Sequence, residues 1–201
     1  HLQPMVAVVT NIEADHMETY GGDFAVLRHT FLEFLHNLPF YGLAILCFDD
    51  PDVREIAESL RKPFVTYGLS RDSEYQAINV RQVGKESFFE VIRFGESIGE
   101  FQLSMPGRHN VQNALAAIAI GYKLELPSQA IRDALAGFEG IGRRFESLGK
   151  ICFDEKVIEL VDDYAHHPTE LAATLQASEE CWEGRRIVVV FQPHRYSRTR
   201  D

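Results

Sequence analysis

The sequence predicts an α/β protein with a mostly parallel sheet, an antiparallel meander of strands, and a second α/β region. Short apolar runs rich in β-branched residues alternate with amphipathic segments of helical period, which is typical of parallel strands joined by helices. Between Tyr75 and Leu103 the pattern changes to strands separated by Gly84-Lys85 and Gly95-Glu96, which indicates a meander. A glycine-rich connector, residues 137–142, then precedes a new strand–helix–strand pattern.

The elements before the meander follow from residue types in chain order. Residues 6–10 form an apolar run that predicts a buried strand, and the polar residues 11–22 predict a loop. Asp23 is a suitable N-cap for a helix with one apolar stripe. The stripe consists of Phe24, Leu27, Phe31, Phe34, Leu35 and Leu38. Residues 43–48 and 64–67 predict two more strands, and Pro51 begins a helix that reaches about Arg61.

Two helices and a second domain are predicted after the meander. The alanine-rich residues 111–124 predict one helix, and Pro127 or Ser128 begins another that ends near Ala136. We place a domain boundary at the glycine connector, which gives a first domain of residues 1–140 and a second of residues 141–201. In the second domain, residues 157–161 and 187–191 predict strands, and residues 170–182 predict the helix between them.

Composition excludes several classes of protein. A chain of 201 residues that is 45% hydrophobic can bury one or two ordinary cores. A formal net charge of −10 argues against a nucleic-acid-binding surface. The three widely spaced cysteines indicate reduced thiols in a cytoplasmic protein instead of a disulfide framework. No apolar run approaches the length of a membrane span, so we expect no membrane insertion.

Polar residues follow both predicted strands of the second domain at the point where each strand ends. The first segment is Asp162-Asp163-Tyr164-Ala165-His166-His167-Pro168, and the second is His194-Arg195-Tyr196-Ser197-Arg198. In open α/β sheets ligands bind beyond the carboxyl ends of strands, and acids, imidazoles and guanidiniums together suit a phosphate-bearing ligand. The alternative is that the histidines lie in a helix N-terminal turn and the arginines in a solvated loop.

Three other clusters are candidates for chemistry. The residues from Thr10 to His16 follow the first strand and could bind a divalent metal, or could form a capped turn. The segment Gly107-Arg108-His109-Asn110, with Asn113, precedes or opens a helix, whose N-terminus attracts phosphate. Its alternative is that Asn110 simply caps the helix. Arg143 and Arg144 lie on the glycine connector and could reach a phosphate or form a solvated linker.

These motifs together resemble those of the Mur ligases, and the resemblance covers essentially the whole chain. In detail they are most similar to the branch that joins L-alanine to UDP-N-acetylmuramate, whereas the branch that recycles a murein tripeptide fits the first and last motifs less well. The resemblance implies that residues 1–140 belong to a P-loop-type ATPase domain and that residues 141–201 begin a Rossmann-like C-terminal domain. It also implies an ATP-dependent amide ligase of the bacterial cytoplasm that forms an acyl phosphate and uses Mg²⁺.

The resemblance also implies roles for individual residues. His16 would ligate magnesium. The nucleotide-binding residues would be His109, Asn110, Asn113, Arg143 and Asp162. The substrate-binding residues would be Tyr164, His166, His194, Arg195 and Arg198. Among these residues, the catalytic ones would be His16, His166 and Arg195. The partners implied are small molecules alone, namely ATP, UDP-N-acetylmuramate and L-alanine, with no nucleic acid.

The phosphate loop of the family is missing from these residues. No Gly-x-x-Gly-Lys-[Ser/Thr] pattern occurs in the chain, which therefore resembles the later part of the ATPase domain and the start of the next domain. We expect the isolated chain to be inactive as a ligase. Ala165 and Ser197 stand where the family usually has Gly and Thr, and neither change removes a charge. Two other classes stay open: a metal-dependent phosphohydrolase, and a catalytically silent binding module.

Overall fold

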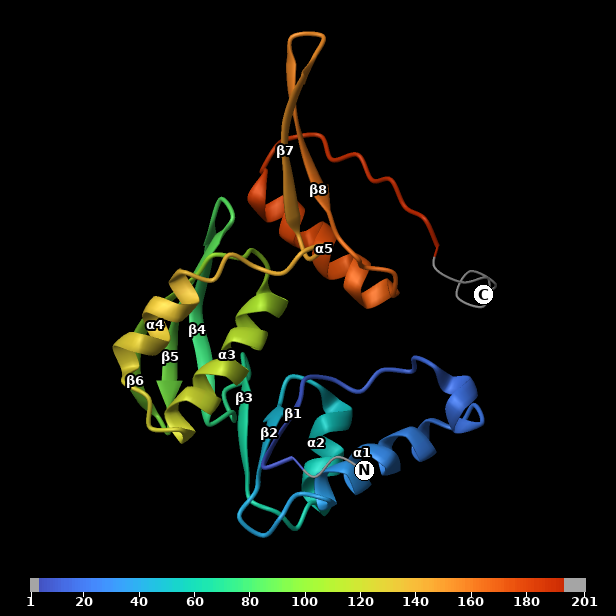
Figure 1. Cartoon of the computed structure of the whole chain (residues 1–201), viewed down its shortest axis with the longest axis vertical. Helices are drawn as coiled ribbons and strands as arrows, with labels where there is room; N and C mark the ends of the chain where they lie inside the picture. The colour runs from blue at the N-terminus through green and yellow to red at the C-terminus, as the bar shows by residue number, and fades with distance from the viewer. Residues whose placement is uncertain (1–3, 194–201) are drawn as a thin grey trace. The chain divides into compact units, whose positions relative to one another are not determined.

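The computed structural model describes residues 4–193, so the predicted site residues His194, Arg195 and Arg198 lie outside the described part of the chain. The chain divides into two compact units (elements labelled in Figure 1). Unit 1 consists of His1–Asn79, Glu90–Glu100 and Gln112–Ile131. Unit 2 consists of Val80–Phe89, Phe101–Val111 and Arg132–Asp201. The strands of the meander contribute residues to both units.

Parallel strands form the first part of unit 1, as the sequence predicts. β1 (Val6–Val9) pairs with β2 (Leu43–Cys47), and β2 pairs with β3 (Phe64–Gly68). The middle residues of β2 are fully buried, which explains why its sequence is continuously apolar instead of alternating. The predicted bounds of all three strands agree with the structure to within one residue at each end.

Helices α1 (Phe24–His36) and α2 (Pro51–Ser59) begin where the sequence predicts. The carboxylate of Asp23 caps α1 by accepting a hydrogen bond from the backbone N–H of Ala25 at 2.8 Å. Buried residues of both helices share one core cluster with side chains of β1 and β2, so the predicted apolar stripe faces inward. A short 3-10 turn, η1 (Met17–Tyr20), lies within the predicted loop.

The meander consists of β4 (Tyr75–Val83), β5 (Glu86–Arg93) and β6 (Glu96–Leu103), and the six strands form one sheet in chain order. Two-residue turns join β4 to β5 and β5 to β6, which makes these neighbours antiparallel. The second turn is Phe94-Gly95, one residue earlier than predicted. Both of its residues adopt a positive φ (49° and 83°), as the central residues of a two-residue hairpin turn do. Since β1 to β4 pair in parallel, the predicted fold class is confirmed.

Helix α3 (Arg108–Lys123) begins three residues before the predicted start, whereas α4 (Ser128–Ala136) matches its prediction. The earlier start brings the whole stretch from Arg108 to Asn113 into α3. The buried side of α3 carries Val111, Leu115 and Ile118, all fully inaccessible to solvent. No helix formed by residues 4–193 is long and apolar enough to cross a membrane.

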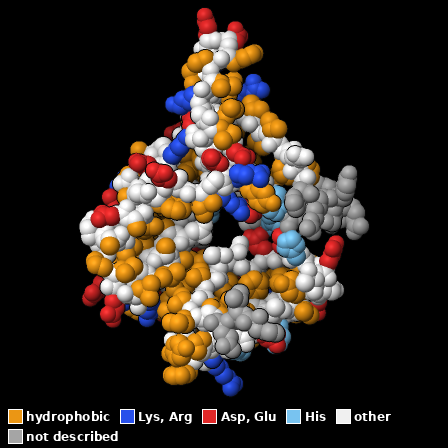
Figure 2. Space-filling model, in the orientation of Figure 1, with side chains coloured by type: hydrophobic (Ala, Val, Ile, Leu, Met, Phe, Trp, Pro, Cys, Tyr) orange, Lys and Arg blue, Asp and Glu red, His pale blue; other side chains and the backbone are white. Residues whose placement is uncertain are grey.

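After the connector, β7 (Glu146–Phe153) and β8 (Lys156–Asp162) form a two-stranded antiparallel sheet, and α5 (Pro168–Cys181) follows. Ile151 pairs with Ile158 near the middle of the hairpin. Many apolar side chains of the hairpin are exposed, and orange atoms at the top of Figure 2 belong to them. The domain boundary near residue 140 stays a prediction.

The predicted strand at residues 187–191 is wrong. These residues are irregular in the structure, and Val188 and Val190 are 69% and 95% exposed. An apolar run becomes a strand only where a neighbouring strand completes its backbone hydrogen bonds. Within residues 4–193, β7 and β8 pair only with each other and leave this run without a partner strand. The predicted strand end at residues 161–162 is therefore formed by β8, whereas the neighbouring strand end predicted at residue 191 is not formed.

Candidate functional site

The loop after β1 presents His16 to solvent. His16 adopts the left-handed conformation (φ 53°, ψ 32°), which is uncommon for a residue other than glycine. Its N–H donates to the Asp15 carboxylate at 2.8 Å, and its carbonyl accepts from the N–H of Thr19 at 2.9 Å. The imidazole is exposed, with Nε2 3.5 Å from the same carboxylate. A fixed, unusual backbone that exposes one imidazole is more typical of a binding loop than of a structural position.

Sequence reasoning missed two acids, Asp49 and Asp50, that follow β2. Asp50 is the N-cap of α2, where it accepts a hydrogen bond from the N–H of Val53 at 2.8 Å. Its other oxygen accepts from the N–H of Ile12 at 3.4 Å, so Asp50 also fixes the loop that carries His16. Burial raises the pKa of Asp50. The available signal was a pair of acids directly after an apolar strand, which is the same signal that selected residues 162 and 163.

Four donors surround the carboxylate of Asp49. They are the N–H of Leu69 at 2.7 Å, the N–H and hydroxyl of Ser70 at 2.9 and 2.8 Å, and the side-chain amide of Gln112 at 2.6 Å. Burial acts to raise the pKa of Asp49, but these hydrogen bonds outweigh burial and hold the pKa below its usual value. Asp49 therefore ties the loops after β2 and β3 to α3.

Helix α3 carries Asn110 and Asn113, two of the predicted nucleotide-binding residues, one turn apart. The side-chain amide of Asn110 donates to the carbonyl of Pro106 at 2.7 Å. An N-cap side chain would instead accept from a backbone N–H, so Asn110 does not play the capping role of the alternative interpretation. Asn113 is exposed and lies on the same helix. Both amides are thus placed on one helix.

His109 lies in the first turn of α3, close to Gly107 and within reach of the charges of Arg144 and Asp163. A Cβ added to Gly107 would lie 2.7 Å from Cε1 of His109, so only glycine fits beside this ring. Burial lowers the pKa of His109, while the negative charge of Asp163 opposes this shift and the positive charge of Arg144 adds to it. The imidazole is therefore neutral at pH 7 and keeps one nitrogen that can accept a hydrogen bond.

Arg143, Asp162 and Tyr164 come together in unit 2. Nε of Arg143 lies 3.3 Å from the Asp162 carboxylate, and its guanidinium lies 4.7 Å from the centroid of the Tyr164 ring. The N–H of Tyr164 donates to the carbonyl of Arg143 at 2.7 Å. Asp163 fixes the same corner by accepting hydrogen bonds from two backbone N–H groups at 2.7 and 2.8 Å. The guanidinium remains largely exposed, so an anion can reach it.

The histidines of the segment form the start of α5. His167 is the N-cap, and its Nδ1 accepts from the N–H of Thr169 at 3.4 Å. Glu170 completes a capping box by accepting from the N–H groups of His166 and His167 at 3.0 and 3.3 Å. The alternative interpretation, in which one histidine serves the helix N-terminus, is confirmed for His167. The ring of His166 contacts the ring of Tyr164 edge-on, with centroids 5.1 Å apart.

Replacing Glu170 by Ala is expected to lower the free energy of unfolding by about 1–2 kcal/mol, because two backbone N–H groups lose their acceptor. Urea denaturation of the 201-residue chain measures this change. Glu179→Ala, on an exposed position of the same helix, is the matched control and is expected to change stability by less than about 0.5 kcal/mol. Equal effects of the two variants would rule out the capping box as a source of stability.

The described residues could hold Mg²⁺ only as an ion that takes most of its ligands from phosphate and water. Among residues 4–193, no group of three or more His, Cys, Asp and Glu side chains is arranged to hold a metal ion. Mg²⁺ at phosphate sites commonly uses one or two protein ligands and completes its shell with phosphate oxygens and water. His16, with Asp15 beside it, can supply such a ligand. The acids and imidazoles at residues 162–167 form no such group with other side chains of the described residues.

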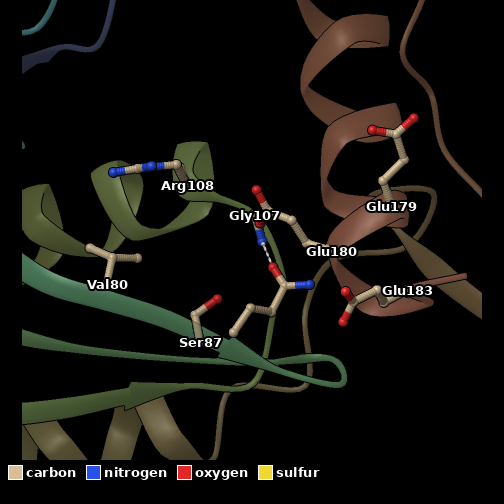
Figure 3. Close-up of a pocket in the computed structure, with 8 residues that line it drawn as sticks. Val80, Ser87, Gly107, Arg108, Glu179, Glu180 and Glu183 are labelled. Atoms are coloured by element: carbon tan, nitrogen blue, oxygen red, sulfur yellow. Dashed lines mark hydrogen bonds between the residues drawn. The ribbon is translucent and has the colours of Figure 1, made fainter.

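A cavity of about 460 Å³ lies in unit 2, where the start of α3 and the C-terminal part of α5 face the strands β4 and β5 (Figure 3). It is lined by Val80, Gln82, Ser87, Gly107, Arg108, Glu179, Glu180 and Glu183. The dashed line in Figure 3 is the hydrogen bond from the N–H of Gly107 to Gln82, 3.0 Å long. None of the predicted site residues within residues 4–193 lines this cavity.

The predicted site residues that the structure describes fall into both units. Unit 1 contains His16 and Asn113. Unit 2 contains His109, Asn110, Arg143, Asp162, Tyr164 and His166. Direct contacts join the last four of these into one cluster, and the charge of Asp163 reaches His109. The roles of all these residues in binding stay predictions.

Two family models match the chain one after the other. The first is the Mur ligase middle domain, which matches residues 1–121. The second is the Mur ligase, glutamate ligase domain, which matches residues 143–201. Every residue that the sequence selected for the site lies in one of these two matched segments.

Solved structures of Mur ligases are similar to this chain. The UDP-N-acetylmuramate-alanine ligase MurC from Thermotoga maritima is 32% identical, with a TM-score of 0.81, over 96% of this chain and 42% of that one. A murein peptide ligase from Psychrobacter arcticus is 27% identical, with a TM-score of 0.64, over 92% of this chain and 37% of that one. MurF from Acinetobacter baumannii is 24% identical, with a TM-score of 0.70, over 87% of this chain and 37% of that one, and it shows the shared fold. The chain thus spans about two fifths of the length of these relatives.

Proposed function

The chain belongs to the Mur ligase family, and we propose that the longer protein containing it, the full-length parent, uses ATP to join L-alanine to UDP-N-acetylmuramate. The observation that carries this proposal is the similarity to the alanine ligase, which exceeds the similarity to the murein peptide ligase in both identity and TM-score. The detail of the sequence motifs supports the same branch. Such an enzyme makes a peptidoglycan precursor in the bacterial cytoplasm.

The proposed reaction has two steps. The γ-phosphoryl group of ATP passes to an oxygen of the lactyl carboxylate, and ADP leaves. The amine nitrogen of L-alanine then attacks the acyl carbon, the tetrahedral intermediate expels inorganic phosphate, and the amine loses a proton to a base. Both steps develop negative charge on phosphate and carbonyl oxygens, so they require cationic groups and oriented hydrogen-bond donors.

The described residues suit the nucleotide half of this reaction. We assign Asn110 and Asn113, with His109 beside them, to the adenine side of ATP, since two amides on one helix can pair with a purine edge. We assign the exposed guanidinium of Arg143 to the phosphates. Asp162, which holds that guanidinium, would contact the ribose or stabilise the closed state.

The remaining predicted residues suit the acceptor substrate and the metal. We assign Tyr164 and His166, whose rings pack edge to face at the start of α5, to the muramate and alanine site. We assign His194, Arg195 and Arg198, which lie outside the described residues, to the same site. His16 would hold Mg²⁺, which when bound neutralises charge on the transferring phosphoryl group.

We expect the full-length parent to release phosphate from Mg-ATP in the presence of both UDP-N-acetylmuramate and L-alanine, and the 201-residue chain to release none. The reason is that the chain has no Gly-x-x-Gly-Lys-[Ser/Thr] loop to hold the β- and γ-phosphates. A coupled phosphate assay on both proteins measures the difference. Alanine-dependent release by the 201-residue chain would overturn the expectation of inactivity.

The same assay separates the alternatives when the amine is varied. Activity with a murein tripeptide and none with L-alanine would move the parent to the recycling branch. Adenine nucleotide binding without turnover on either amine would identify a silent binding module. Hydrolysis of phosphate esters without any amine would restore the phosphohydrolase.

A further inference from the structure

The side chain of Gln82, on β4, joins two segments that are far apart in the sequence. Its Oε1 accepts a hydrogen bond from the N–H of Gly107 at 3.0 Å (Figure 3). Its Nε2 lies 3.3 Å from the carbonyl of Ala177 and 3.0 Å from Sγ of Cys181, both on α5. The oxygen and the nitrogen of this amide are thus both hydrogen bonded. Because the oxygen only accepts and the nitrogen only donates, the amide can join Gly107 to α5 in one orientation alone.

The Gly107 end of this connection controls the start of α3. Gly107 directly precedes the helix and has a φ of +94°, a conformation that favours glycine. A Cβ at this position would lie 2.7 Å from the ring of His109 and 3.1 Å from Cβ of Ala177. A shift of Gly107 therefore moves His109 and the first turn of α3, which carry the proposed adenine contacts.

Neighbouring contacts keep the turn between β4 and β5 against the C-terminal end of α5. Sγ of Cys181 donates to the carbonyl of Gly84 at 3.1 Å. The ammonium of Lys85 pairs with the carboxylate of Glu159 and lies 5.7 Å from the centroid of the Trp182 ring. These contacts hold the turn in place, whereas the amide of Gln82 reaches both the start of α3 and α5.

We propose that Gln82 is a positioning residue that couples nucleotide binding at the start of α3 to the placement of α5. Helix α5 directly follows its N-cap His167 and the preceding His166, which is assigned to the acceptor substrate, so a shift of the helix along its axis moves His166 too. Gln82 itself need touch neither ATP nor the acceptor. This inference rests on the proposed function for its kinetic readout.

Two substitutions separate the two ends of the amide in the full-length parent. Gln82→Glu keeps the acceptor for Gly107 and loses the donor for Ala177 and Cys181, so we expect kcat to fall about tenfold while KM for ATP changes less than about twofold. Gln82→Leu loses both ends, so we expect KM for ATP to rise about tenfold as well.

The matched control is Gln102 on β6, which carries the same side chain in the same unit. Its amide donates to the exposed carboxylate of Glu86 at 3.0 Å and contacts neither α3 nor α5 in any hydrogen bond described above. We expect Gln102→Glu and Gln102→Leu to retain the parent's kcat and KM. If the Gln82 variants match the Gln102 variants, the proposed coupling is wrong.

A second readout does not depend on turnover. Burial raises the pKa of the Cys181 thiol to about 11, so its modification by a maleimide is slow and sensitive to small movements of α5. Peptide mass spectrometry follows this rate with and without a non-hydrolysable ATP analogue. We expect the analogue to slow modification of Cys181 in the parent but not in Gln82→Leu. An equal response in both proteins would overturn the coupling, even if the parent acted on another amine.

Discussion

Replacing His16 by Ala in the full-length parent is expected to lower alanine-dependent phosphate release by about 10²–10³-fold. The imidazole is exposed and presented by a left-handed backbone that hydrogen bonds to Asp15 and Thr19 hold in place. Loss of a metal ligand at this position removes part of the charge neutralisation that phosphoryl transfer requires. The Mg²⁺ concentration for half-maximal activity should therefore rise in the same variant, which a magnesium titration of the phosphate assay measures.

A control on α1 distinguishes this role from a general effect of removing an imidazole. His29 is also exposed and also lies 3.5 Å from a carboxylate, that of Glu33. His29→Ala is expected to keep full activity and the parent's magnesium requirement. His16→Asn replaces the imidazole nitrogen with an amide oxygen, which Mg²⁺ accepts as a ligand, and Asn tolerates the left-handed backbone, so this variant should recover part of the activity. If His16→Ala resembles His29→Ala, His16 does not belong to the site.

Local signals explain why the first part of the fold could be predicted. Buried parallel strands are continuous apolar runs, and turn residues mark their ends, so β1, β2 and β3 were placed to within one residue. Helix caps act within a few residues of the chain, which is why Asp23 and Pro51 marked the starts of α1 and α2. Each of these predictions depended on residues that are adjacent in the sequence.

Predictions failed where the outcome depends on distant residues. The run at residues 187–191 has the composition of a buried strand, but no strand among residues 4–193 pairs with it. The start of α3 was placed three residues too late because Arg108, His109 and Asn110 are polar, and hydrophobic periodicity does not register a polar first turn after Gly107. Phe94 was not predicted to lie in the turn, because a bulky residue rarely adopts a positive φ.

The candidate site shows the same division between local and distant information. Acids directly after an apolar strand identified Asp162, and the same rule, applied to β2, would have identified Asp49. The contact between Arg143 and Asp162 joins residues 19 positions apart, and only the fold of unit 2 creates it. Gln82 and Gln112 carry no local signal at all, because an amide on a strand or helix is ordinary until its partners are known.

Replacing Asp49 by Ala is expected to lower the free energy of unfolding by about 2–4 kcal/mol, because it leaves partly buried donors of Leu69, Ser70 and Gln112 without their acceptor. Urea denaturation of the 201-residue chain at pH 7 measures the change. Asp72→Ala is the matched control: its carboxylate pairs with Arg54 at an exposed position, so its loss should cost less than about 1 kcal/mol. Similar losses in the two variants would contradict the argument.

The pH and salt dependence of these variants separates the two kinds of stabilisation. Burial acts to raise the pKa of Asp49, but hydrogen bonds from Gln112, Leu69 and Ser70 lower it. The pKa of Asp72 is lowered by its hydrogen bonds from Arg54. For both groups the folded pKa is depressed, so the stabilisation is complete above the unfolded value of about 3.9 and is lost as pH falls through the folded pKa. Added salt screens the exposed pair but not hydrogen bonds from backbone groups. In 0.5 M NaCl (a concentration of about three times physiological ionic strength), the unsubstituted 201-residue chain should therefore stay more stable than Asp49→Ala, while its greater stability over Asp72→Ala disappears.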